Sequence, residues 1–120
     1  MKKDPAFFLK HIVECIRRIE KFTFEIEEED FLKDELISSA VIRQIEVIGE
    51  AVKNLPLDFI NKYTQILWGD IAGTRDKMIH HYFGVDLKLV WKIVIDDLPT
   101  LKKQTENILE KINEKQRKLV

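Results

Sequence analysis

The sequence has a single cysteine, Cys15, among 120 residues. One thiol cannot form an intramolecular disulfide or a cysteine-rich zinc site, so neither device is expected to hold the fold. A chain without disulfides fits a reducing compartment, and we expect a cytoplasmic protein. No stretch approaches the roughly 18 consecutive apolar residues of a membrane span, which argues against a membrane protein.

Glycine, proline and an excess of either charge are also scarce. Twenty basic and 21 acidic residues give a net charge of −1, so an RNA ligand would have to meet a local basic patch. Four glycines and three prolines leave few positions that interrupt secondary structure. The composition that remains is 45% apolar and 34% charged, which is too apolar for disorder and typical of one globular domain.

Apolar residues recur every three or four positions along nearly the whole chain, which predicts an all-α protein. Asp4 and Pro5 are suited to begin the first helix, Pro56 to end the second, and Gly84 to cap the third at its C-terminus. Pro99 should kink or interrupt the last helix, because its ring displaces a backbone hydrogen bond. The predicted helices cover residues 5–24, 31–55, 57–63, 66–83 and 87–112.

Long amphipathic helices with short connections predict an antiparallel bundle of four to five helices, the last one interrupted at Pro99. Residues 1–112 would form the domain, and the basic segment of residues 113–120 would fray. This fold does not by itself indicate a function.

The segment of residues 75–82 carries the distinctive chemistry. Arg75 falls within the apolar stripe of the predicted helix 66–83, where a charge is costly unless it is paired or faces a cleft. Tyr82 would share the face of Arg75, and His80 would lie about 140° away from Arg75 on an ideal helix. Asp76 precedes His80 by four residues, the spacing at which helical side chains touch, so its carboxylate could orient the imidazole.

These residue types suit phosphodiester chemistry without a metal or a cofactor. The fork of Arg75 matches phosphate oxygens, His80 can exchange a proton near neutral pH, and Tyr82 can bind phosphate or stack on a base. We expect no metal site, because His80 and His81 are adjacent and would point apart on a helix. RNA cleavage through the ribose 2′-hydroxyl needs a base and an acid, but one chain offers one convincing histidine. We therefore predict a homodimer with a composite cleft.

With these residues the chain resembles the HepT-like branch of the HEPN superfamily. Arg75, His80 and Tyr82 match the motif R-x-x-x-x-H-x-Y. Two flanking segments also resemble this branch: Ile48-Gly49-Glu50-Ala51 and Trp68-Gly69-Asp70-Ile71-Ala72-Gly73. The resemblance covers nearly the whole chain.

The resemblance implies a HEPN-like helical domain and the toxin of a toxin–antitoxin system. The toxin would be a metal-independent ribonuclease with Arg75 and His80 as catalytic pair, and with Asp76 at the polar position after the arginine. Its partner would be an MntA-type minimal nucleotidyltransferase antitoxin, which transfers AMP from ATP to Tyr82. The toxin would act as a homodimer or within a higher hetero-assembly with this partner. Phosphates on Tyr82 would obstruct a phosphate-binding cleft. The resemblance assigns no role to His81.

Ordinary structural roles compete with each of these interpretations. Arg75 could be a salt-bridged structural residue, His80 and His81 could favour the negative end of a helix dipole, and Tyr82 could be a core residue. The same dimer could be a non-catalytic module that binds RNA, a nucleotide or its partner, and the domain could also be a purely structural adaptor. Several other residues are expected to serve the fold or the surface: Gly49 (helix approach), Glu50 (ion-paired or solvated), Trp68 and Trp91 (core), and Cys15 (packing).

Overall fold

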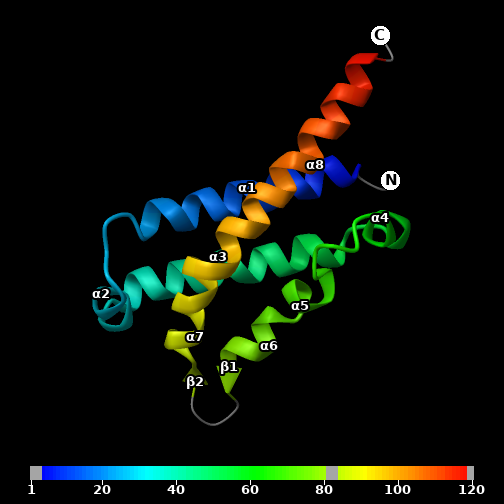
Figure 1. The fold of residues 1–120 in the computed structure, drawn as a ribbon. Coiled ribbons are helices and arrows are strands. Elements are labelled where there is room, and N and C mark those ends of the chain that lie inside the picture. Colours follow the sequence, from blue (N-terminus) through cyan, green and yellow to red (C-terminus); the bar gives the residue numbers. More distant parts are fainter. Residues whose placement is uncertain (1–3, 81–83, 119–120) are drawn as a thin grey trace.

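The computed structural model describes residues 4–80 and 84–118, with only the main chain of His80. Helices dominate this part of the chain, so the predicted all-α class is confirmed (Figure 1). Helix α1 (Pro5–Phe22) begins as expected, because the side chain of Asp4 accepts a hydrogen bond from the amide of Ala6 at 3.0 Å. It ends two residues before the predicted limit, where the hydroxyl of Thr23 donates to the carbonyl oxygen of Ile19.

The predicted single helix over residues 31–55 is two helices, α2 (Glu28–Lys33) and α3 (Glu35–Lys53). Asp34 between them has a φ of −97° and a ψ of 97°, which is outside the helical region. Its side chain accepts a hydrogen bond from the amide of Ile37 at 3.0 Å and so caps α3. The apolar period continues across Asp34, and for this reason periodicity alone predicted one helix.

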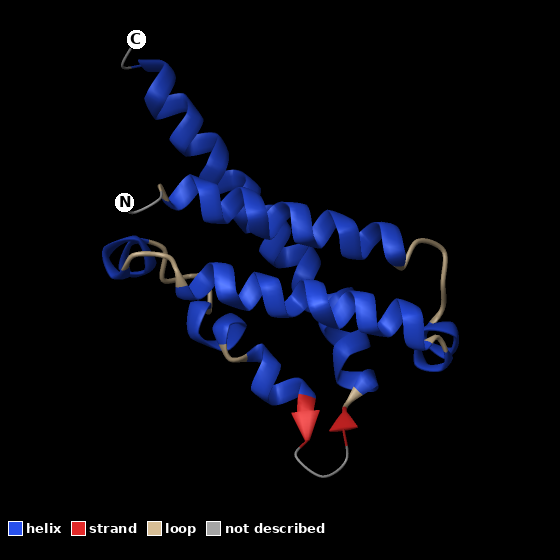
Figure 2. Ribbon diagram, turned by 180° about the vertical axis from the view of Figure 1, so that it is seen from behind, coloured by secondary structure: helices blue, strands red, loops and turns tan. Residues whose placement is uncertain are grey.

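Helices α1 and α3 lie side by side, and α8 packs against α1 (Figures 1 and 2). Their apolar faces form most of the core, which is closed at one end by Phe31 and Trp91, whose ring centroids are 5.2 Å apart. Fully buried side chains of this core include Leu9, Ile12, Cys15, Ile16, Ile19, Val41, Ile48 and Val52. Cys15 is therefore a packing residue, as expected.

The predicted helix over residues 66–83 is also wrong as a single element. After α4 (Leu57–Lys62), the chain forms two short helices, α5 (Trp68–Ala72) and α6 (Thr74–Met78), which meet at Gly73. Helix α6 ends because Ile79 turns to extended backbone, with a φ of −104° and a ψ of 121°. The predicted end at residue 83 lies outside the described residues.

Strands β1 (Ile79–His80) and β2 (Gly84–Val85) replace the end of that predicted helix. They are antiparallel, with His80 opposite Gly84 (Figure 2). The amide of Asp86 also donates to the carbonyl oxygen of Met78 at 2.8 Å. Gly84 has a φ of +79°, which is the left-handed conformation expected of it, but it starts a strand and does not cap a helix.

The last helical run is continuous through α7 (Leu87–Lys92), the π-helical segment η1 (Ile93–Asp97) and α8 (Leu98–Lys118). Asp86 caps its start by accepting from the amide of Leu89 at 3.1 Å. The interruption expected at Pro99 is the wider turn of η1 directly before it, in which the amide of Leu98 donates to the carbonyl of Ile93. Such a turn accommodates the proline ring without breaking the helix.

Helix α8 continues through Lys118. The fraying expected of residues 113–120 stays a prediction. Figure 1 shows this end projecting beyond α1. Within residues 4–80 and 84–118, no helix combines the length and the apolar content needed to cross a bilayer.

Candidate active site

Arg75 lies on α6 and is exposed, with 62% of its side chain accessible. The prediction that it interrupts a buried apolar stripe is wrong, because the break at Gly73 and the shortness of α6 change which residues face inward. Met78 is the residue of α6 that is fully buried. Arg75 is therefore also not the ion-paired core residue that the structural-adaptor hypothesis required.

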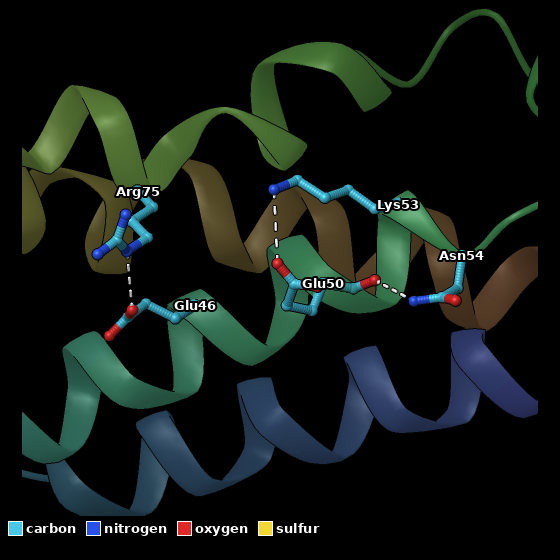
Figure 3. Close-up of polar contacts among 5 residues, drawn as sticks. All are labelled: Glu46, Glu50, Lys53, Asn54 and Arg75. Atoms are coloured by element: carbon cyan, nitrogen blue, oxygen red, sulfur yellow. Dashed lines mark hydrogen bonds and ion pairs between the residues drawn. The ribbon is translucent and has the colours of Figure 1, made fainter.

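One carboxylate holds Arg75 in place. Its Nε donates to Oε2 of Glu46 at 3.1 Å, and Glu46 comes from α3, 29 residues earlier in the sequence (Figure 3). Glu46 itself is half-buried, with 29% of its side chain accessible. The two terminal Nη atoms of Arg75 have no hydrogen bond or ion pair with any residue that the structure describes. That end of the guanidinium can therefore bind an anion.

The main chain of His80 lies near that of Arg75, because a backbone hydrogen bond links Arg75 to the residue before His80. The amide of Ile79 donates to the carbonyl oxygen of Arg75, and His80 is the next residue, in β1. Since α6 ends at Met78, the four-residue helical spacing from Asp76 to His80 does not apply, and the same holds for the predicted angle between Arg75 and His80. The side chain of His80 and the residues His81 and Tyr82 lie outside the described part, and the structure leaves their predicted roles untested.

The charges around Arg75 are mixed. Asp76 is exposed on α6, and Lys77 forms an ion pair with Asp70, with Nζ 3.6 Å from Oδ1. Glu46 adds a further negative charge beside Arg75. Charges of both signs therefore lie on and beside α6.

The two flanking segments of the motif have structural roles that can be read directly. Gly49 faces the main chain of α5, where an added Cβ would lie 3.4 Å from the carbonyl oxygen of Ile71. Trp68 is buried, and its Nε1 donates to the carbonyl of Tyr63 at 3.0 Å. Close approach of α5 to α3 sets the position of α6, which follows Gly73 and brings Arg75 over Glu46.

Glu50 lies one turn beyond Glu46 on α3 and has a different partner. It is exposed and pairs with Lys53, at 3.4 Å between Oε1 and Nζ (Figure 3). This agrees with the expectation of an ion-paired surface residue. The carboxylate that sequence reasoning missed is Glu46, and its signal was an acid between Ile45 and Val47 within the most apolar stretch of the helix.

A groove of about 540 Å³ lies beside this region, between α5–α6 and the run η1–α8. Its lining combines apolar side chains with polar ones, among them Thr74 and Lys77 of α6 and Asp96 and Asp97 of η1. Arg75 is not one of its lining residues. Across residues 4–80 and 84–118, histidines, cysteines and acids nowhere form a group of three that could hold a metal ion.

Comparison with known proteins assigns the chain to a family. The family described as "Ribonuclease HepT-like" matches residues 12–108. "Putative RNase MJ0127" of Methanocaldococcus jannaschii is 50% identical over 111 residues, which cover 92% of both chains. "Probable ribonuclease HepT" of Thermococcus cleftensis is 48% identical over 108 residues, covering 90% of this chain and 98% of the relative.

A third relative, "Putative RNase TTE0752" of Caldanaerobacter subterraneus, is 44% identical over 113 residues, covering 91% of this chain and 97% of its own. No solved structure matches the chain significantly. The family match covers most of the sequence, including α3, the site around Arg75 and most of the last helical run. The chain belongs to the HepT-like ribonuclease family of the HEPN superfamily.

Proposed function

We propose that this protein is a metal-independent ribonuclease that acts as the toxin of a toxin–antitoxin system. The proposal rests on the contacts of Arg75 in a chain that belongs to a ribonuclease family. Its guanidinium is exposed, and among the described residues its one polar partner is Glu46 at Nε, with none at the Nη atoms. An arginine in that state is suited to bind a phosphodiester. It is not needed to fill or neutralise the core.

In the proposed reaction, Arg75 binds the non-bridging oxygens of the scissile phosphate and stabilises the charge that develops there. One His80 imidazole accepts the proton of the ribose 2′-hydroxyl as its oxygen attacks phosphorus. A second imidazole donates a proton to the 5′-oxygen as its bond to phosphorus breaks. The products are a 2′,3′-cyclic phosphate and a 5′-hydroxyl end, and no cofactor takes part.

The acid and the base come from two protomers in this proposal. A single chain supplies one His80, so a two-fold dimer is the simplest assembly that places two imidazoles at one phosphate. His80 pairs with Gly84 in the short hairpin that joins α6 to α7. The two strands of this hairpin lie away from both termini (Figure 2).

Tyr82 serves as the control point in the same proposal. A nucleotidyltransferase antitoxin of the MntA type transfers AMP from ATP to its hydroxyl, which forms a phosphodiester and releases pyrophosphate. The added negative charge, two residues from His80, would compete with RNA for Arg75. Asp76, exposed beside Arg75, supports the site through its charge.

The test is cleavage of RNA by protein purified without antitoxin, in the presence of EDTA. Wild-type protein should cleave, and His80→Ala should not. His11→Ala is the matched control, because His11 is an exposed histidine on α1, away from the site. Equal cleavage by wild type and His80→Ala would discard the mechanism. Binding of RNA without any cleavage by the wild type would favour a non-catalytic binding module instead.

A further inference from the structure

The contact between Glu46 and Arg75 links the long, well-packed helix α3 to the short helix α6. Helix α3 has 19 residues, and both Ile45 and Ile48 are buried in the core, so the main chain of Glu46 is fixed. Helix α6 has five residues and lies between Gly73 and the turn into β1. Such a short helix gains little stability of its own.

The side chain of an arginine on a short helix adopts one orientation only if a neighbouring residue holds it there. Its side chain carries about 2 kcal/mol of rotamer entropy, which favours many orientations over one. Glu46 accepts from Nε only, at 3.1 Å, so it fixes the plane of the guanidinium without occupying the Nη end (Figure 3). A partner seated on the Nη atoms would instead have blocked the end that fits a phosphate.

We propose that Glu46 is a positioning residue that orients Arg75 for the phosphate through the Nε contact. This inference rests on the ribonuclease function proposed above. It assigns Glu46 no contact with RNA and no proton transfer. Its effect is on the geometry of Arg75 alone, as expected when a catalytic side chain is supported by a neighbour on a rigid element.

The kinetic test compares two substitutions at this position. Glu46→Ala removes the acceptor and should lower kcat for RNA cleavage by about tenfold or more, with KM within about threefold of wild type. Glu46→Gln keeps an oxygen that can accept from Nε and should restore kcat to within about threefold. The matched control is Glu106→Ala, which breaks another exposed interhelical pair, Arg17–Glu106 at 3.2 Å, and should leave kcat unchanged.

A second measurement is independent of catalysis. In His80→Ala protein, the Nε–H proton of Arg75 should exchange with water slowly, and adding Glu46→Ala should accelerate that exchange about tenfold or more. If wild-type protein does not cleave RNA, the proposed function fails, and this exchange rate still decides whether the contact exists. Unchanged exchange, or equal kcat for wild type and Glu46→Ala, overturns the positioning role. Faster cleavage by both Glu46 variants would also overturn it, because Glu46 would then be repelling RNA.

Discussion

Gly49 of α3 packs against the carbonyl oxygen of Ile71 in α5, where an added Cβ would lie at 3.4 Å. An alanine fits there at contact distance, and its gain in helix propensity of about 0.5–1 kcal/mol offsets the crowding. We therefore expect Gly49→Ala to be close to neutral. Gly49→Leu should lower the free energy of unfolding by about 1–3 kcal/mol, because it must displace main chain. Urea unfolding measures both.

Gly69 is the control for this prediction. It lies on α5, and apart from its own helix turn no atom of the described residues comes within 4 Å of a Cβ built on it. Gly69→Leu should therefore not lower the free energy of unfolding. Equal losses at Gly49 and Gly69 would contradict the close approach of α5 to α3.

Arg75→Ala should separate stability from activity. The Arg75–Glu46 pair is exposed on the arginine side, so its loss should change the free energy of unfolding by less than about 1 kcal/mol. Cleavage of RNA should be lost. Arg17→Ala breaks a comparable exposed pair and should retain cleavage. A sharp fall in melting temperature for Arg75→Ala with unchanged cleavage would identify Arg75 as purely structural.

Cys15 should make the stability fall at high pH. Burial raises the pKa of its thiol above the ordinary value of 9.0, because the thiolate is desolvated in the core. Below the ordinary value both states keep the proton, and the contribution of this group is constant. As pH rises above it, the unfolded chain loses the proton first, so the free energy of unfolding declines. Unfolding at pH 7 and pH 10 should show a smaller decline for Cys15→Ala than for wild type, and an identical decline would contradict the assignment.

Tyr82→Phe should abolish modification without abolishing cleavage. The sequence contains two tyrosines, and Tyr63 is the control because it is half-buried between α4 and α5. Incubated with ATP and a nucleotidyltransferase antitoxin, wild type and Tyr63→Phe should gain mass in steps of about 330 Da. Tyr82→Phe should gain none and should stay active. Intact mass spectrometry decides, and a mass gain in Tyr82→Phe would place the modification elsewhere.

Local signals in the sequence predicted the parts of the fold that local interactions determine. Asp4 caps the first helix where expected. The second long helix ends at Lys53, before the predicted limit, and Pro56 directly precedes α4 instead of ending α3. The split at Asp34 was missed because the apolar period runs through it. The hairpin was missed because residues 75–82 also fit a helical pattern, and the pairing of Ile79 with Val85 depends on residues beyond that pattern.

The same distinction applies to the site. Arg75 was singled out by its chemistry and its place in the motif, and its catalytic role stays a prediction. Glu46 could not be, because its contact with Arg75 depends on how α6 packs on α3, 29 residues away. The interpretation of Gly49 as a point of helix approach was confirmed, since a Cβ added there would lie 3.4 Å from the carbonyl oxygen of Ile71.

The positive φ of Gly84 has a consequence for the evolution of this protein. Any L-residue there would cost about 1–2 kcal/mol of backbone strain. Gly84 is the residue that pairs with His80 in the two-stranded sheet, so this strain would act directly on that pairing. If the proposed mechanism holds, a substitution at Gly84, which carries no reactive group, would lower activity by disturbing His80. A genetic screen for non-toxic variants would then be expected to recover changes at Gly84 as well as at His80 and Arg75.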